Sequence, residues 1–190
     1  QGGEPLAKLV EEIRLLDERI KEDLPARVEM YRALNQLYYG LGQFEKSLEA
    51  SKAGIAIAPN EPEFNNNAAY TLSKQLNRPE EALPFAEAAR RAAPTNSAVL
   101  DTLGQVYLQL NKIPEAIESL GQAVDYAKGP DEVVAANLHL GMARMQTKPN
   151  PDIAAARKCY DRARDAAAKL PEFTRKQFDT DLESLRRMVQ

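Results

Sequence analysis

At the start of this chain, apolar residues recur with the spacing of one helix face, and charged residues occupy the positions between them. The apolar positions, three or four residues apart, are Leu6, Leu9, Ile13, Leu16 and Ile20. This spacing predicts one helix over residues 5–23, with its charged side chains on the opposite face. We expect the helix to pack on the segment that follows it. A coiled-coil seam that joins two chains is the alternative, although the segment is short for a coiled coil.

The end of the chain shows a second apolar stripe on a polar background. Phe178, Leu182, Leu185 and Val189 fall on one face of a helix that we expect to begin near Pro171. A helix with one apolar face and one polar face is the expected design of a terminal cap, which covers a core on one side and meets water on the other.

Between these segments a longer motif recurs. Its best copy contains, in order, Leu103, Gly104, Tyr107, Asn111, Ala116, Leu120 and Ala123. Corresponding positions in successive copies, such as Tyr38 and Leu72, are 34 residues apart. Pro59 and Pro94 are 35 residues apart, which places one extra residue in the second copy, near Leu76. The fourth copy carries insertions around residues 129–130 and 147–151.

This motif resembles that of the tetratricopeptide repeat family, in which Trp-x-x-Leu-Gly-x-x-Tyr precedes Ala-x-x-x-Phe and Pro over about 34 residues. The resemblance covers roughly residues 28–168, and residues 77–84 are similar to bacterial members. It implies an all-α fold, a right-handed α–α superhelical solenoid of about four helix hairpins. The implied division is an N-terminal helix in 1–27, repeats in 28–61, 62–96, 97–130 and 131–168, and a capping helix in 169–190. Half of an upstream repeat is the alternative for the segment 1–27.

The first copy departs from the family pattern. Ser47, Ser51 and Gly54 stand where the family has Ala, Phe and Ala, so we expect looser packing there. Small residues at other copies, such as Gly104 and Gly141, are expected to let the two helices of a hairpin approach closely.

The predicted breaks carry suitable turn and cap residues. Gly42, Asn77 and Asn111 suit the left-handed conformation that follows a helix end. Pro79 and Pro114 suit the first turn of the next helix, where a missing N–H has no cost. The residues expected to cap the helices that begin each hairpin are Asn60, Asn96 and Asp131.

The resemblance also implies where a partner binds, because the first helix of each hairpin lines the concave surface in this family. The candidate partner-binding residues are Arg32, Gln36, Tyr39, Asn66, Asn67, Tyr70, Lys74, Asp101, Thr102, Gln105, Leu108, His139 and Met142. The N-terminal half of this candidate groove is polar and aromatic, and its C-terminal half is more apolar, with Leu138 and Met145 nearby. Amides such as Asn67 and Gln36 both donate and accept, so we expect them to hold a peptide backbone.

Two alternatives stand beside this interpretation of the groove. The polar residues can simply be solvated, and the C-terminal helix can cover Leu138 or Met142. Arg32 is the only basic residue at the positions where chaperone-binding members of the family hold a carboxylate, so binding of acidic chaperone tails is disfavoured.

Composition narrows the class of protein. The chain has 190 residues, a net charge of −3 and 28% charged residues, which suits one soluble globular or solenoid unit. No run approaches the ~18 apolar residues of a membrane-spanning helix, and the mixed charges give no footprint for nucleic acid. The start, Gln1-Gly2-Gly3, has neither methionine nor an apolar signal region, so we expect a piece of a longer protein, and the compartment is not predicted.

Catalytic chemistry is not predicted. His139 is the only histidine and Cys159 the only cysteine, which cannot supply the three or four ligands of a zinc site. A single cysteine also excludes an intramolecular disulfide, and a small buried side chain is the expected role of Cys159. No phosphate loop, Rossmann glycine pattern or Gly-x-Ser-x-Gly is present. We therefore expect no cofactor, no metal and no enzyme.

The sequence favours a scaffold that binds a protein or peptide in the groove. Two other functions stay open. One is a structural or oligomerisation module that assembles through its terminal helices, and the other is an accessory domain of a larger multidomain protein.

Overall fold

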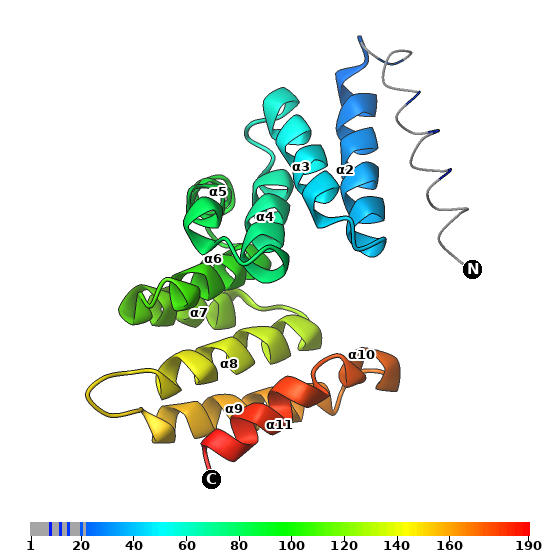
Figure 1. Cartoon of the computed structure of the whole chain (residues 1–190). Coiled ribbons are helices and arrows are strands. Elements are labelled where there is room, and N and C mark those ends of the chain that lie inside the picture. Colours follow the sequence, from blue (N-terminus) through cyan, green and yellow to red (C-terminus); the bar gives the residue numbers. More distant parts are fainter. Residues whose placement is uncertain (1–7, 9–11, 13–14, 16–19, 21) are drawn as a thin grey trace. The chain divides into compact units, whose positions relative to one another are not determined.

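The computed structural model describes residues 8, 12, 15, 20 and 22–190 (Figure 1). Most of the helix expected over residues 5–23 lies outside this part of the chain. The chain divides into two compact units, Gln1–Ala92 and Ala93–Gln190. Within the described residues both units consist of helices and contain no strand, which confirms the expected all-α fold of repeated hairpins.

Unit 1 contains two helix hairpins. Its helices are α2 (Leu24–Gly40), α3 (Phe44–Ile57), α4 (Pro62–Tyr70), the π-helix η1 (Thr71–Gln75) and α5 (Pro79–Ala92). Helix α2 packs against α3, α3 against α4, and α4 against α5 (Figure 1). Asp23 starts α2, since its Oδ1 accepts a hydrogen bond from the Ala26 amide at 3.1 Å and so satisfies an N–H that has no partner within the helix.

Apolar side chains from neighbouring helices form the core of unit 1. Met30, Leu34 and Tyr38 of α2 are buried with Ala50 of α3. Phe64 of α4 is fully buried against Gly54 of α3, where an added Cβ would lie 2.5 Å from the phenyl ring. The looser packing expected in the first copy is therefore wrong at Gly54, because the missing side chain admits Phe64.

Unit 2 contains two further hairpins and two C-terminal helices. Its helices are α6 (Ser97–Gln109), α7 (Ile113–Tyr126), α8 (Pro130–Met145), α9 (Ile153–Ala167), α10 (Glu172–Lys176) and α11 (Asp179–Met188). Helix α6 packs against α7 and α8 against α9, while α11 packs on both α8 and α9 (Figure 1).

Two glycines of unit 2 permit close contacts between these helices. A Cβ at Gly104 of α6 would lie 2.4 Å from the Leu120 side chain of α7, which is the hairpin contact expected for this residue. A Cβ at Gly141 of α8 would lie 2.5 Å from Leu185 of α11 and 3.3 Å from Cys159 of α9. Gly141 thus makes room for the C-terminal helix as well as for its hairpin partner.

The hairpin turns have the predicted backbone. Gly42, Asn77 and Asn111 have φ angles of 71°, 53° and 57°, which is the left-handed conformation that ends a helix. Pro79 begins α5, and Pro114 lies in the first turn of α7.

The predicted caps are correct at one position of three. Asn96 caps α6, because its Oδ1 accepts a hydrogen bond from the Val99 amide at 3.2 Å. Asn60 is wrong as a cap, since α4 begins after Glu61, and Asp131 is wrong because it lies inside the first turn of α8. Inside that turn a carboxylate still favours the helix through its dipole.

The helix expected to begin near Pro171 is divided into two helices, and the apolar stripe lies on the second of them, α11, and on its two cap residues. Helix α10 ends at Lys176 and α11 begins at Asp179. Leu185 and Val189 are buried, and Phe178 and Leu182 are partly buried, against a cluster that includes Leu138. The break at Gln177 and Phe178 allows Phe178 to join this cluster.

Candidate functional site

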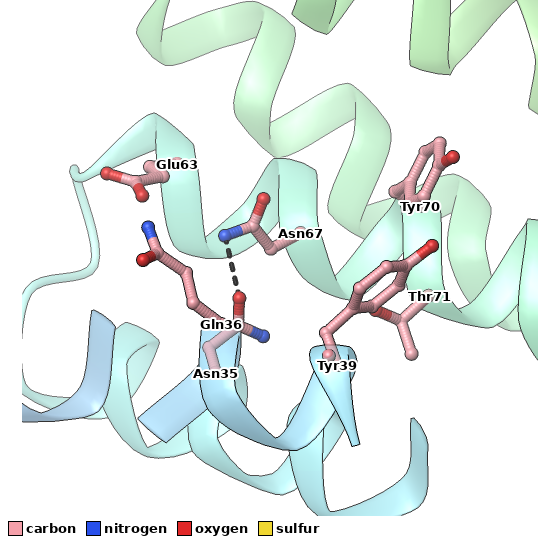
Figure 2. Close-up of a pocket in the computed structure, with 8 residues that line it drawn as sticks. Asn35, Gln36, Tyr39, Glu63, Asn67, Tyr70 and Thr71 are labelled. Atoms are coloured by element: carbon pink, nitrogen blue, oxygen red, sulfur yellow. Dashed lines mark hydrogen bonds between the residues drawn. The ribbon is translucent and has the colours of Figure 1, made fainter. Parts of the chain in front are cut away.

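A hollow of about 400 Å³ lies in unit 1, where α2 faces α4 and the start of η1. Its lining residues are Asn35, Gln36, Tyr39, Gly40, Glu63, Asn67, Tyr70 and Thr71. Figure 2 shows most of these side chains, with the two tyrosines on one side and Gln36 and Glu63 on the other. Four of them, Gln36, Tyr39, Asn67 and Tyr70, are candidates from the sequence.

A buried asparagine forms the floor of the hollow. Asn35 is 4% exposed, and its Nδ2 donates to Ser47 Oγ at 2.8 Å, to Ser51 Oγ at 2.7 Å and to the Ser47 carbonyl at 3.0 Å. Because these three acceptors lie on α3, the amide nitrogen must point toward α3. The Asn35 oxygen therefore points toward α4.

The orientation of the Asn35 amide fixes the orientation of the Asn67 amide. Asn67 Nδ2 donates to Asn35 Oδ1 at 3.0 Å (Figure 2). An asparagine that donates toward the floor directs its own oxygen away from it, and Figure 2 shows this oxygen on the far side of the Asn67 amide. Asn67 Oδ1 is thus a held acceptor, suited to an N–H donor of a bound molecule.

Aromatic rings form a second wall. The rings of Tyr39 and Tyr70 have centroids 6.1 Å apart and an interplanar angle of 47°, and Tyr39 also meets Phe44 edge to face at 5.5 Å. Gln75 Nε2 donates to the Tyr39 hydroxyl at 2.6 Å. These contacts limit the conformations of Tyr39 and keep its ring at the hollow.

The opposite wall is charged. Arg32 donates from Nε to Glu63 Oε2 at 2.6 Å and also pairs with Glu29. The pKa of the Arg32 guanidinium is raised above its ordinary value, by the hydrogen bond to Glu29 first and then by the one to Glu63. Arg32 therefore stays charged and holds Glu63 in place.

The π-helix η1 absorbs the extra residue of the second copy. Between Ala69 and Asn77 the chain has one residue more than between the corresponding Gly104 and Asn111. The Leu76 amide accordingly bonds to the Thr71 carbonyl, five residues back, at 3.1 Å. A wide turn of this kind accommodates an insertion within a helix and is frequent at functional sites. Here it begins at Thr71, in the wall of the hollow.

The structure brings a second group of candidates together in unit 2. His139 Nδ1 and Asp101 Oδ1 are 2.7 Å apart, and the Gln105 amide donates to Asp101 Oδ2 at 2.7 Å. Thr102 is buried, and its hydroxyl donates to the Ala98 carbonyl of its own helix. Asp101 thus accepts from Gln105 and lies against His139, while the buried Gln105 Oε1 has no hydrogen-bond partner among the residues that the structure describes.

The other candidates lie outside both groups. Leu108 and Met142 are partly buried and pack on core clusters. Lys74 is exposed on η1 and does not line the hollow. Asn66 is half-buried, and its Oδ1 has no hydrogen-bond partner in the part of the chain that the structure describes.

Leu138 cannot line a groove, because it is 1% exposed in the cluster that α11 covers. This outcome matches the alternative in which the C-terminal helix covers it.

Sequence reasoning missed Asn35 and Glu63. A signal for Asn35 was present: Asn35 occupies the position of Gly104, and the facing positions of its copy hold Ser47 and Ser51 in place of Ala116 and Leu120. A large amide that faces two hydroxyls is the signature of a buried hydrogen-bond network.

Other chemistry receives no support from the described residues. They contain no group of three or more His, Cys, Asp or Glu side chains that could hold a metal ion. Cys159 is free and buried, and desolvation raises the pKa of its thiol. Among the same residues, no helix combines the length and apolar character needed to cross a membrane.

The hairpins and their turns define a helical-repeat protein. The sequence model of the tetratricopeptide repeat family matches residues 75–139. This match covers 65 of the 190 residues, and the hairpins of both units have the same repeat fold. No curated protein is significantly similar to it in sequence.

Solved structures share the fold at low sequence identity. A double mutant of MamA from strain RS-1 matches with a TM-score of 0.70 at 20% identity, over 86% of this chain and 85% of that one. A tetratricopeptide repeat protein of Thermus thermophilus matches at 0.64 and 22%, over 93% and 88%. YrrB, described as a tetratricopeptide repeat protein with an unusual peptide-binding site, matches at 0.61 and 14%, over 93% and 98%.

Proposed function

We propose that this protein is an interaction scaffold that binds an extended peptide segment of a partner in the hollow of unit 1. The observation that carries the proposal is the fixed acceptor at Asn67, held by the Asn35 network beside the two tyrosine rings. An N–H of a peptide backbone fits the acceptor, and a side chain fits against the rings.

The hollow has properties that favour binding. Its volume of about 400 Å³ falls in the range of small ligand sites, about 300–1,000 Å³. Asn67 and Tyr39 are already held by hydrogen bonds to Asn35 and Gln75. Binding therefore costs little free energy for ordering the side chains of Asn67 and Tyr39, and a lower ordering cost raises affinity.

The family and one similar structure give further support. Tetratricopeptide repeats are arrays with long surfaces for partners. YrrB, which shares the fold, is described as having a peptide-binding site. Its low identity of 14% limits this support to the fold, so the site itself rests on the geometry of unit 1.

Selection from a displayed library of random 12-residue peptides, followed by fluorescence anisotropy with the selected peptides, tests the proposal. The double substitution Gln36→Ala and Tyr70→Leu removes an exposed amide and an aromatic face from the hollow. We expect it to weaken binding more than about tenfold, or by about 1.4 kcal/mol, with unchanged helicity by circular dichroism.

The matched control lies in unit 2. Asp101→Ala with Gln105→Ala removes the other group of candidate residues and is expected to leave affinity within about twofold. Binding that depends on Asp101 and Gln105 but not on Gln36 and Tyr70 would place the peptide site in unit 2 and refute the proposal.

A further inference from the structure

The polar groups at the hollow share one electrostatic character. Its lining contains one carboxylate, Glu63, and neither lysine nor arginine, within the residues that the structure describes. Asn67 presents an amide oxygen, and the faces of Tyr39 and Tyr70 carry the negative part of the aromatic quadrupole. Each of these groups attracts positive charge.

The positive charge of Arg32, beside the hollow, does not cancel the attraction of the hollow for cations. Arg32 lies between two carboxylates, Glu29 and Glu63, so one positive charge faces two negative charges. The Arg32–Glu29–Glu63 cluster keeps a net charge of −1. Only the Glu63 side of the cluster reaches the hollow, because Glu29 is not among the lining residues and its side chain is 70% exposed.

We propose that the hollow selects a basic segment, in which a lysine or arginine side chain enters between the two tyrosine rings and Glu63. This inference rests on the proposed function and names the chemistry of its partner. A cation near a tyrosine face within about 6 Å of the ring centroid is attracted by the ring, and more strongly where water is partly excluded. Glu63 supplies the counter-charge, and Asn67 Oδ1 accepts from the backbone of the same segment.

Other side chains fit the hollow less well. An acidic side chain would face Glu63 and the electron-rich ring faces. An aliphatic side chain would cover the rings and partly desolvate the Glu63 carboxylate, but it would give that carboxylate no partner beyond Arg32, which is unfavourable. The chain as a whole has a net charge of −3, which also favours the approach of basic segments.

The probe is a positional-scanning library of N-acetylated, C-amidated hexapeptides, measured by fluorescence anisotropy on the full chain. We expect enrichment of lysine and arginine at one position. Affinity of the enriched peptides should fall severalfold between 50 mM and 300 mM salt, because exposed charges are screened.

A pair of substitutions isolates the role of the carboxylate. Glu63→Gln and Glu29→Gln each remove one partner of Arg32, but only Glu63 lines the hollow. We expect Glu63→Gln to weaken lysine peptides about tenfold and Glu29→Gln to change affinity less than about twofold. Equal effects would mean that Arg32, rather than the hollow, controls binding, and would overturn the inference.

Substitutions of Tyr70 isolate the role of the ring. Tyr70→Phe keeps the aromatic face and should retain most of the affinity, whereas Tyr70→Leu keeps apolar volume and should lose it. Equal affinity of the two variants would overturn the cation–ring contact.

Two results separate this inference from the proposed function. Enrichment of acidic or aliphatic residues, with binding still lost in Gln36→Ala plus Tyr70→Leu, overturns the basic partner and keeps the peptide site. If peptides bind equally well after substitution of Gln36 and Tyr70, or if the library yields no binding peptide, both the basic partner and the peptide site are overturned.

Discussion

Asn35 and Gly104 occupy the same position in two copies of the repeat, and each is matched by its facing helix. At Gly104 the missing side chain admits Leu120, which an added Cβ would approach to 2.4 Å. At Asn35 the facing residue is Ser51, which is smaller and accepts a hydrogen bond at 2.7 Å. The same interhelical space is thus filled by an aliphatic side chain in one copy and by a polar network in the other.

Removing Asn35 should destabilise unit 1. Asn35→Ala leaves Ser47, Ser51 and Asn67 without their shared partner, and an unsatisfied buried polar group costs about 1–3 kcal/mol. We expect a loss of this size in the free energy of unfolding, measured by urea denaturation followed by circular dichroism.

A compensating variant tests the explanation. Asn35→Gly with Ser47→Ala and Ser51→Leu copies the arrangement of Gly104, Ala116 and Leu120, and should recover much of the lost stability. It should still bind peptide weakly, since Asn67 loses the acceptor that orients it. A triple variant no more stable than Asn35→Ala would show that the two copies are not interchangeable in packing.

The site could be predicted in part. Gln36, Tyr39, Asn67 and Tyr70 were predicted to share a groove because the repeat register, which is visible in the sequence, places them on corresponding faces of two first helices, and all four line the hollow. Asn35 and Glu63 were missed, because their roles depend on Ser47 and Arg32 of other helices, and such pairings are decided only by packing.

Short-range chemistry explains which features of the helices the sequence predicts well. Left-handed turns at Asn77 and Asn111 depend on the residue itself, and both were predicted correctly. Caps were predicted less well: Asn96 caps α6, but Asn60 does not cap α4. A cap depends on where a helix begins, and the position of that first turn is set partly by packing.

The π-helix leaves the following hairpin turn intact. The Gln43 and Lys112 amides bond to the Tyr38 and Tyr107 carbonyls, each five residues back, at 2.9 Å. In the second copy the matching bond joins the Arg78 amide to the Leu72 carbonyl, six residues back, at 2.8 Å. The same closing bond therefore encloses one more residue.

Deletion of Lys74 should convert η1 to an α-helix. The deletion restores the seven-residue step that separates Gly104 from Asn111, and Lys74 is exposed, so the fold should be retained. Gln75 would turn by about 100° around the helix axis and lose its bond to Tyr39. We expect unchanged helicity by circular dichroism and several-fold weaker peptide binding.

Lys74→Ala is the control for this deletion, since it removes the charge and keeps the residue count. Equal binding by the deletion variant and the wild type would show that η1 has no role in shaping the hollow.

The reactivity of the buried Cys159 thiol reports whether unit 2 is folded around it. Cys159 is 5% exposed and lies, like Leu185, against Gly141. Burial raises the pKa of its thiol, so the reactive thiolate forms only above the usual pH, and a thiol reagent should react chiefly after local opening. Because the unfolded thiol ionises near pH 8.5, unit 2 should be most stable below that pH and lose stability as the pH rises above it.

Leu185→Ala should open this region. Leu185 is fully buried, and a leucine-to-alanine change in a core typically costs about 2–5 kcal/mol. We expect much faster reaction of Cys159 with a disulfide reagent at pH 8. Met188→Ala is the matched control on the same helix, since Met188 is 49% exposed, and should leave the rate unchanged. Equal rates for Leu185→Ala and the wild type would contradict the role of α11 as a cover.

The π-helix has a consequence for comparing this chain with its relatives. Sequence alignments usually place gaps in loops, yet the additional residue here lies inside a continuous helical segment, between Ala69 and Asn77. The closing bonds place Leu72 opposite Tyr107, so the additional residue follows Leu72. A gap placed in the following loop would shift Ser73 through Leu76 by one position against other repeats. The correct alignment inserts the gap directly after Leu72, so that Gln75, which holds the Tyr39 hydroxyl, is compared with its true structural equivalent.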